Sequence, residues 1–171
     1  MSLSSPLCQP IGDGREILNP KLGRLFAYWR SKQRGQIAPA RRDIDPAEIP
    51  RLLPWVWLVD VVDGGSDFRF RIGGEKLVEF LGRRMTGETT NALASSPFFS
   101  NIAQAFAQCV RERRPILRPL ARTAHEQRNY LETEAVFLPL SENGADISQI
   151  FGGFAMTSPV GDTIGRDAPA V

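Results

Sequence analysis

The amino-acid sequence predicts an α+β domain: a five-stranded antiparallel sheet with helices packed on one face, plus an N-terminal flanking helix. Two observations lead to this prediction. A hairpin of two strand-like segments runs directly into a short helix, and three more strand-like segments follow a long amphipathic helix. Short connections favour antiparallel neighbours, and one sheet covered by helices is the simplest way to bury both kinds of element.

The hairpin is the clearest of these elements. Residues 55–62 form an almost wholly apolar run, rich in the β-branched and aromatic residues that favour strands. Phe68, Phe70 and Ile72 then alternate with arginines, which is the period of a half-buried strand. The two glycines between these segments supply the positive φ angles that a tight connection needs. We therefore predict an antiparallel pair here.

Three helices are expected around this hairpin. Asn19 followed by proline is a start signal for the N-terminal helix, and Ser96 followed by proline opens the long helix. After Gly74 the apolar residues change to helical spacing, which predicts a short helix over residues 75–81. Three further strands are expected over residues 116–123, 130–140 and 147–157.

Bulk properties indicate a single cytoplasmic domain. The chain has 171 residues and a formal net charge of +2, so it lacks the strongly basic surface of most nucleic-acid binders. No segment is apolar enough for a secretory signal or a membrane helix, and the two cysteines lie far apart. The expected organisation is a flexible N-terminal segment, one domain and a flexible C-terminal tail, over residues 1–18, 19–157 and 158–171.

Several segments resemble the PAS family, in particular a branch of short bacterial single-domain proteins whose function has long been unassigned. The most specific of them read DIDPAEIPRLLP, FRFRIGG and LVEFLGRRMTG, with YLETEAVFLPL further on. The resemblance covers residues 22–157. It implies five antiparallel strands that cup a cavity closed by helices, and a sensory or protein-interaction role that is usually non-catalytic. It also implies that the lead helix, residues 22–33, is the flanking helix that often mediates PAS dimerisation.

Two groups of apolar residues are the candidate binding residues. Four residues expected to face the interior form the predicted pocket for a small apolar ligand: Phe70, Ile72, Phe106 and Phe137. Four residues on one stripe of the lead helix form the predicted homodimer contact: Leu22, Leu25, Phe26 and Trp29. Core packing of this stripe is the alternative.

The carboxylates form no evident catalytic constellation. Asp60 interrupts an apolar run, so it is either an acid of raised pKa or, as we expect, a solvent-facing partner of Arg69 or Arg71 across the hairpin. Glu132 and Glu134 alternate with apolar residues and are expected on a solvated strand face. We therefore predict no catalytic residue.

No metal or cofactor is predicted. The region that carries the flavin-linked cysteine of light-sensing PAS domains reads LVEFLGRRMTG, which contains no cysteine. His125, the single histidine, lies in a polar segment and is expected in a surface loop rather than on a haem. One histidine with two distant cysteines does not make a zinc site.

The sequence thus predicts a non-catalytic PAS-type sensory domain of bacterial signal transduction that binds a partner protein, a small apolar ligand or both. Binding would favour one packing of the helices against the sheet. Two alternatives stay open: a small cone-like α+β enzyme of the isomerase type with a pocket carboxylate as base, and an Arg-rich regulator that binds nucleic acid.

Overall fold

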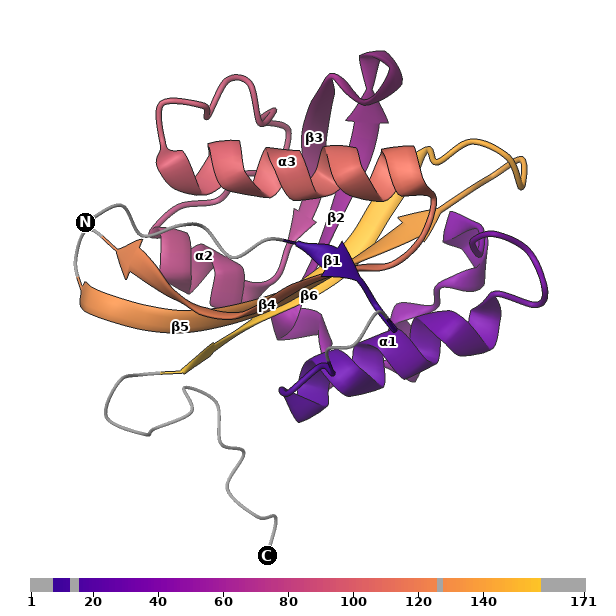
Figure 1. Cartoon of the computed structure of the whole chain (residues 1–171), viewed down its shortest axis with the longest axis horizontal. Helices are drawn as coiled ribbons and strands as arrows, with labels where there is room; N and C mark the ends of the chain where they lie inside the picture. The colour runs from indigo at the N-terminus through magenta and orange to yellow at the C-terminus, as the bar shows by residue number, and fades with distance from the viewer. Residues whose placement is uncertain (1–7, 13–15, 126–127, 158–171) are drawn as a thin grey trace, which may run out of the picture.

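The chain folds around one antiparallel sheet (Figure 1), in a computed structural model that describes residues 8–12, 16–125 and 128–157. Within these residues the strands are β1 (Gln9–Pro10), β2 (Val56–Val62), β3 (Asp67–Gly73), β4 (Ile116–His125), β5 (Arg128–Leu140) and β6 (Gln149–Thr157). They lie in the order β1-β4-β5-β6-β2-β3, and all neighbours are antiparallel. The predicted α+β class is confirmed.

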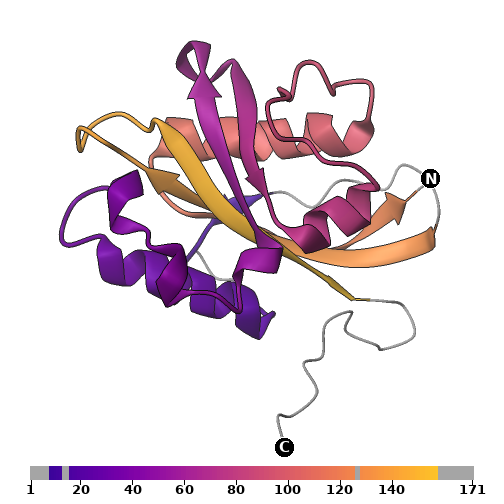
Figure 2. The same cartoon turned by 180° about the vertical axis from the view of Figure 1, so that it is seen from behind.

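Helices lie on both sides of the sheet (Figures 1 and 2). The helices α2 (Glu75–Leu81) and α3 (Pro97–Glu112) cover one face, called the inner face below, and α1 (Pro20–Lys32) covers the opposite, outer face. Short 3₁₀ helices occupy Arg41–Asp43, Pro46–Glu48, Leu53–Trp55 and Asp63–Gly65. The predicted flanking helix therefore exists, and it packs on the domain itself.

The helix α1 packs closely on the sheet because β6 has a glycine at the point of contact. A Cβ built on Gly153 would lie 2.8 Å from Leu25 Cδ2, so only glycine allows the helix to approach this closely. Leu22, Leu25 and Trp29 are each 1% exposed, and Trp29 Nε1 donates a hydrogen bond of 2.8 Å to the carbonyl of Pro139 in β5. A dimer contact through these three side chains would require α1 to leave the sheet.

The β2–β3 hairpin departs from the predicted alternation at one point. Phe68 and Phe70 are buried, but Ile72 is 44% exposed, so the prediction that Ile72 faces the interior is wrong. The pairing shifts register between Leu58 and Val59. This irregularity breaks the two-residue period, and beyond it Ile72 no longer shares the buried face of Phe70.

Both edges of the sheet carry short additional pairings. Along β3, the backbone of residues 87–90 forms hydrogen bonds of 2.7–3.0 Å to Phe68 and Phe70. Along β4, Gln9 and Pro10 pair with Leu117 and Ile116. This pairing falls in the segment 1–18 that was predicted to be a flexible lead-in. Capped edges leave fewer free backbone groups for intermolecular strand pairing.

The chain between β4 and β5 is shorter than predicted. His125 is the last residue of β4 and pairs with Arg128 at the start of β5. The backbone of His125 is therefore in a strand, and the prediction of a surface loop at this residue is wrong. The alternation of apolar and polar residues weakens there, which is why the sequence indicated an earlier end. The predicted tail, residues 158–171, lies outside the described residues.

Candidate functional site

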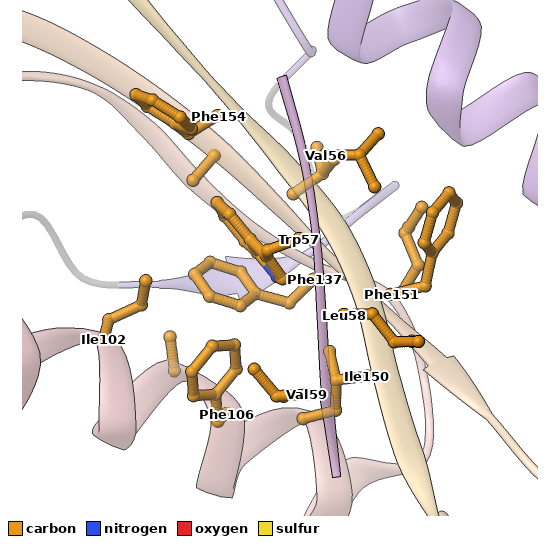
Figure 3. Packing of buried hydrophobic residues seen from close by; sticks show 14 of the residues in the cluster. Val56, Trp57, Leu58, Val59, Ile102, Phe106, Phe137, Ile150, Phe151 and Phe154 are labelled. Carbon is orange, nitrogen blue, oxygen red and sulfur yellow. The ribbon is translucent and has the colours of Figure 1, made fainter. Parts of the chain in front are cut away.

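An aromatic layer fills the space between α3 and the inner face of the sheet (Figure 3). Phe106 of α3 lies at its centre, with ring centroids 5.2 Å from Phe68, 5.4 Å from Phe137 and 6.2 Å from Phe70. Trp57 of β2 meets Phe106 edge-on at 6.3 Å. These tilted and edge-to-face arrangements are the favourable ones for aromatic pairs. We use the name aromatic layer for Trp57, Phe68, Phe70, Phe106, Phe137 and Phe154.

Three of the four predicted pocket residues meet in this layer. Phe70, Phe106 and Phe137 are each 0% exposed, and Phe106 contacts both of the others. Ile72 does not join them, for the reason given above. The predicted set omitted Trp57, because residues 55–62 are almost wholly apolar and the sequence alone does not show which of them face α3.

The register of the sheet explains why Trp57 fits in the layer. Trp57 pairs with Gly152 of β6 on one side and with Gly73 of β3 on the other, and Phe137 also pairs with Gly152. A large residue therefore alternates with glycine across this row. A Cβ on Gly152 would lie 2.7 Å from Trp57 Nε1 and 2.3 Å from the carbonyl oxygen of Val136. Only glycine leaves room for the indole.

No residue of the aromatic layer carries an acid or a base. Cys109 of α3 lies beside it, is 0% exposed and directs its Sγ to the carbonyl oxygen of Phe137 at 3.7 Å. Burial raises the pKa of the Cys109 thiol well above its ordinary value, with a smaller contribution from the charge of Glu112. The thiol therefore stays protonated and is a poor nucleophile. The aromatic layer is thus an apolar interior without a group suited to proton transfer.

Asp60 lies outside the aromatic layer, near the end of β2. Its carboxylate pairs with the guanidinium of Arg71 and accepts a hydrogen bond of 2.8 Å from Gln149 Nε2. The expected pairing across the hairpin is thus confirmed. Both interactions hold the Asp60 side chain at this end of the sheet, away from the aromatic layer.

Glu134 is buried, and the prediction that it lies on a solvated face is wrong. Its side chain is on β5 beneath the start of α1, and the residue is 1% exposed. The two carboxylate oxygens accept hydrogen bonds from the backbone N–H groups of Leu18 and Asn19, at 2.8 and 2.7 Å. Asn19 in turn caps α1, accepting from the backbone of Lys21 and Leu22. Glu134 therefore holds the N-terminal end of α1 against the sheet.

A family model of the PAS domain matches residues 18–155. The chain belongs to the PAS family. The expected resemblance is confirmed, and PAS domains are in general sensory or regulatory domains that mediate interactions and usually lack catalysis.

One solved structure is also similar to this PAS domain. It is the PAS domain of BvgS from Bordetella pertussis, with 16% sequence identity and a TM-score of 0.49, and the match covers 67% of this chain and 88% of that chain. No curated protein matches the chain.

The PAS domain also has an open cleft of about 670 Å³ at its surface. It lies between the β2–β3 hairpin and the turn before β6, and is lined by Arg41, Asp60, Val61, Val62, Asp63, Arg69, Glu142, Ser148 and Gln149. Both signs of charge line it. Two of its carboxylates are already engaged inside the domain, since Asp60 pairs with Arg71 and Glu142 accepts from the backbone of Arg41 at 2.8 Å.

Two further findings concern the described part of this PAS domain. None of its helices is long and apolar enough to cross a membrane. Within the same residues, no group of three or more histidine, cysteine, aspartate or glutamate side chains is placed to hold a metal ion.

Proposed function

We propose that this PAS domain is a non-catalytic regulatory module of bacterial signal transduction that binds a small apolar ligand in the aromatic layer and transmits the change to a partner protein. The aromatic layer is the observation that carries the proposal. It is enclosed between α3 and the sheet, and its members are apolar except for one indole N–H. Reversible apolar binding suits such an interior better than proton transfer does.

In this proposal, α3 is the element that shifts relative to the sheet when the ligand binds. It is joined to the sheet by side-chain packing of residues such as Ile102 and Phe106, and packed helices slide past a neighbouring layer at low cost. A ligand that binds better when α3 is displaced shifts the population toward that arrangement. The outer helix α1 packs on the same sheet and the hairpin β2–β3 forms one edge of it, so either is a route to the partner.

Three parts of the proposal concern the setting. The domain works in the cytoplasm, its interior holds no flavin or haem as a resident cofactor, and its partner is a signalling protein or a second copy of the chain. Nucleic acid is not among the proposed partners, because the net charge is only +2. The isomerase alternative is disfavoured because Asp60 is paired with Arg71 instead of lying in the layer.

Native mass spectrometry of freshly purified protein tests the ligand directly. We expect a retained molecule of low polarity, and a variant that fills the layer should lose it. Ile102→Phe adds ring volume beside Phe106, whereas Gln104→Ala changes an exposed position of the same helix. Loss with Ile102→Phe and retention with Gln104→Ala support the proposal. Retention by both variants would place the ligand elsewhere.

A further inference from the structure

One polar group in the aromatic layer has no partner. Trp57 is 0% exposed, and among the described residues its Nε1 makes no hydrogen bond. Buried indole N–H groups usually find an acceptor, because a buried donor without one loses the hydrogen bond that it makes to water in the unfolded chain. Trp29 provides the contrast within the same chain, because its Nε1 donates to the carbonyl oxygen of Pro139 at 2.8 Å.

The neighbours of Trp57 explain why its N–H stays unpaired. The ring contacts are with Phe106, Phe137 and Phe154, at centroid distances of 6.3, 5.3 and 6.2 Å. None of these side chains has an acceptor atom. Figure 3 shows the indole nitrogen on the side of Phe137, and a Cβ on Gly152 of β6 would lie 2.7 Å from it. The donor therefore lies on the sheet side of the region where the proposed ligand binds.

The surroundings also restrict the charge of a ligand. Among the described residues the buried polar side chains are Thr90, Thr133, Glu134 and Ser141, and none belongs to the aromatic layer. The carboxylate of Glu134 is engaged with the start of α1 on the outer face. An ionic ligand would find no counter-charge in the layer, and an unpaired buried charge is very costly.

We propose that the ligand is a neutral, largely aromatic or aliphatic molecule with one hydrogen-bond acceptor, such as a ketone, ester or ether oxygen, and that Trp57 Nε1–H donates to it. This inference rests on the proposed function, because it names the chemistry of the same interior site. Displacement of α3 admits the molecule, and the new hydrogen bond satisfies the orphaned donor. A hydrocarbon of equal shape would leave the donor unpaired and bind more weakly.

Two probes of nearly equal shape isolate the hydrogen bond. Acetophenone carries a carbonyl oxygen where α-methylstyrene carries a methylene group. The dissociation constants of both are measured by titration of the full chain, for wild type and for Trp57→Phe. This variant keeps an aromatic ring but removes the N–H. We expect the preference for acetophenone over α-methylstyrene to be about tenfold greater in the wild type than in Trp57→Phe.

Trp29→Phe is the matched control, since its N–H already has a protein acceptor on the outer face. It should leave the preference unchanged. A direct readout covers the case in which Trp57→Phe does not fold: the indole ¹H–¹⁵N signal of Trp57 in the wild type should move downfield with acetophenone but not with α-methylstyrene.

The remaining outcomes separate the two proposals. If both probes bind and the preference is the same in wild type and Trp57→Phe, the interior binds ligands but Trp57 is not the donor, and this inference is overturned. If neither probe binds or shifts any signal of the layer, the proposed ligand site itself is overturned as well.

Discussion

Replacing Gly153 by alanine tests whether α1 belongs to the folded core. The added Cβ would lie 2.8 Å from Leu25 Cδ2, 3.1 Å from the carbonyl oxygen of Trp55 and 3.3 Å from Leu22 Cδ2. Neither leucine can withdraw into solvent, since each is 1% exposed, and the carbonyl belongs to the backbone. Overpacking of a filled core costs ~1–3 kcal/mol, so we expect Gly153→Ala to lower the free energy of unfolding by about 2 kcal/mol.

Gly23→Ala is the matched control on the helix itself. A Cβ on Gly23 would have nothing within 4 Å, and alanine is favoured over glycine inside a helix by about 1 kcal/mol. The two variants should therefore move the midpoint of urea unfolding in opposite directions at similar m-values, as followed by circular dichroism. If Gly153→Ala is as stable as the wild type, α1 does not dock on β6, and its apolar stripe is free to contact a second chain.

Two more predictions concern the β2–β3 hairpin. Ile72→Ser should change the free energy of unfolding by less than about 0.5 kcal/mol, whereas Phe70→Ala should cost ~3–5 kcal/mol; equal effects in thermal or urea melts would contradict the exposure of Ile72. Partial burial of the Asp67 carboxyl opposes ionisation, but hydrogen bonds from the backbone of Asn91 and Phe68 and from Thr90 outweigh it and hold its pKa below the ordinary value. Asp67 thus contributes stability above the unfolded pKa of about 4, and this is lost as pH falls through the lower folded pKa. Asp67→Asn should lower the melting temperature at pH 7 by ~2–4 °C, with the difference shrinking below about pH 4; a difference that is constant down to pH 2 would exclude this role.

The sequence predicted the architecture well because the relevant patterns are local. The start of α1, the short helix α2 and the Phe-rich face of α3 follow from caps and apolar spacing that a single segment contains. The same reasoning brought Phe70, Phe106 and Phe137 together correctly. Each of these residues alternates or repeats with a period that one element sets.

The errors concern properties that depend on two segments at once. The exposure of Ile72 results from a register shift against β2, and the burial of Glu134 results from a helix that starts far earlier in the chain. Neither partner is visible in the local pattern of Ile72 or Glu134. The glycines that pair with Trp57 also depend on a second segment, because the pairing with Gly152 follows only from the order of the strands in the sheet.

The packing of α1 on β6, the last strand of the chain, has a consequence during translation. The ribosome makes α1 early, but it makes β6, on which α1 packs, as the last strand. The strand β2 also lacks its neighbour until β6 has been made. At ~5–20 residues translated per second, the apolar stripe Leu22–Trp29 of the nascent chain stays unpacked for on the order of ten seconds before β6 is made. Chaperones that bind apolar segments near the ribosome have that interval in which to engage the N-terminal helix. Truncation before β6 would leave the stripe permanently exposed.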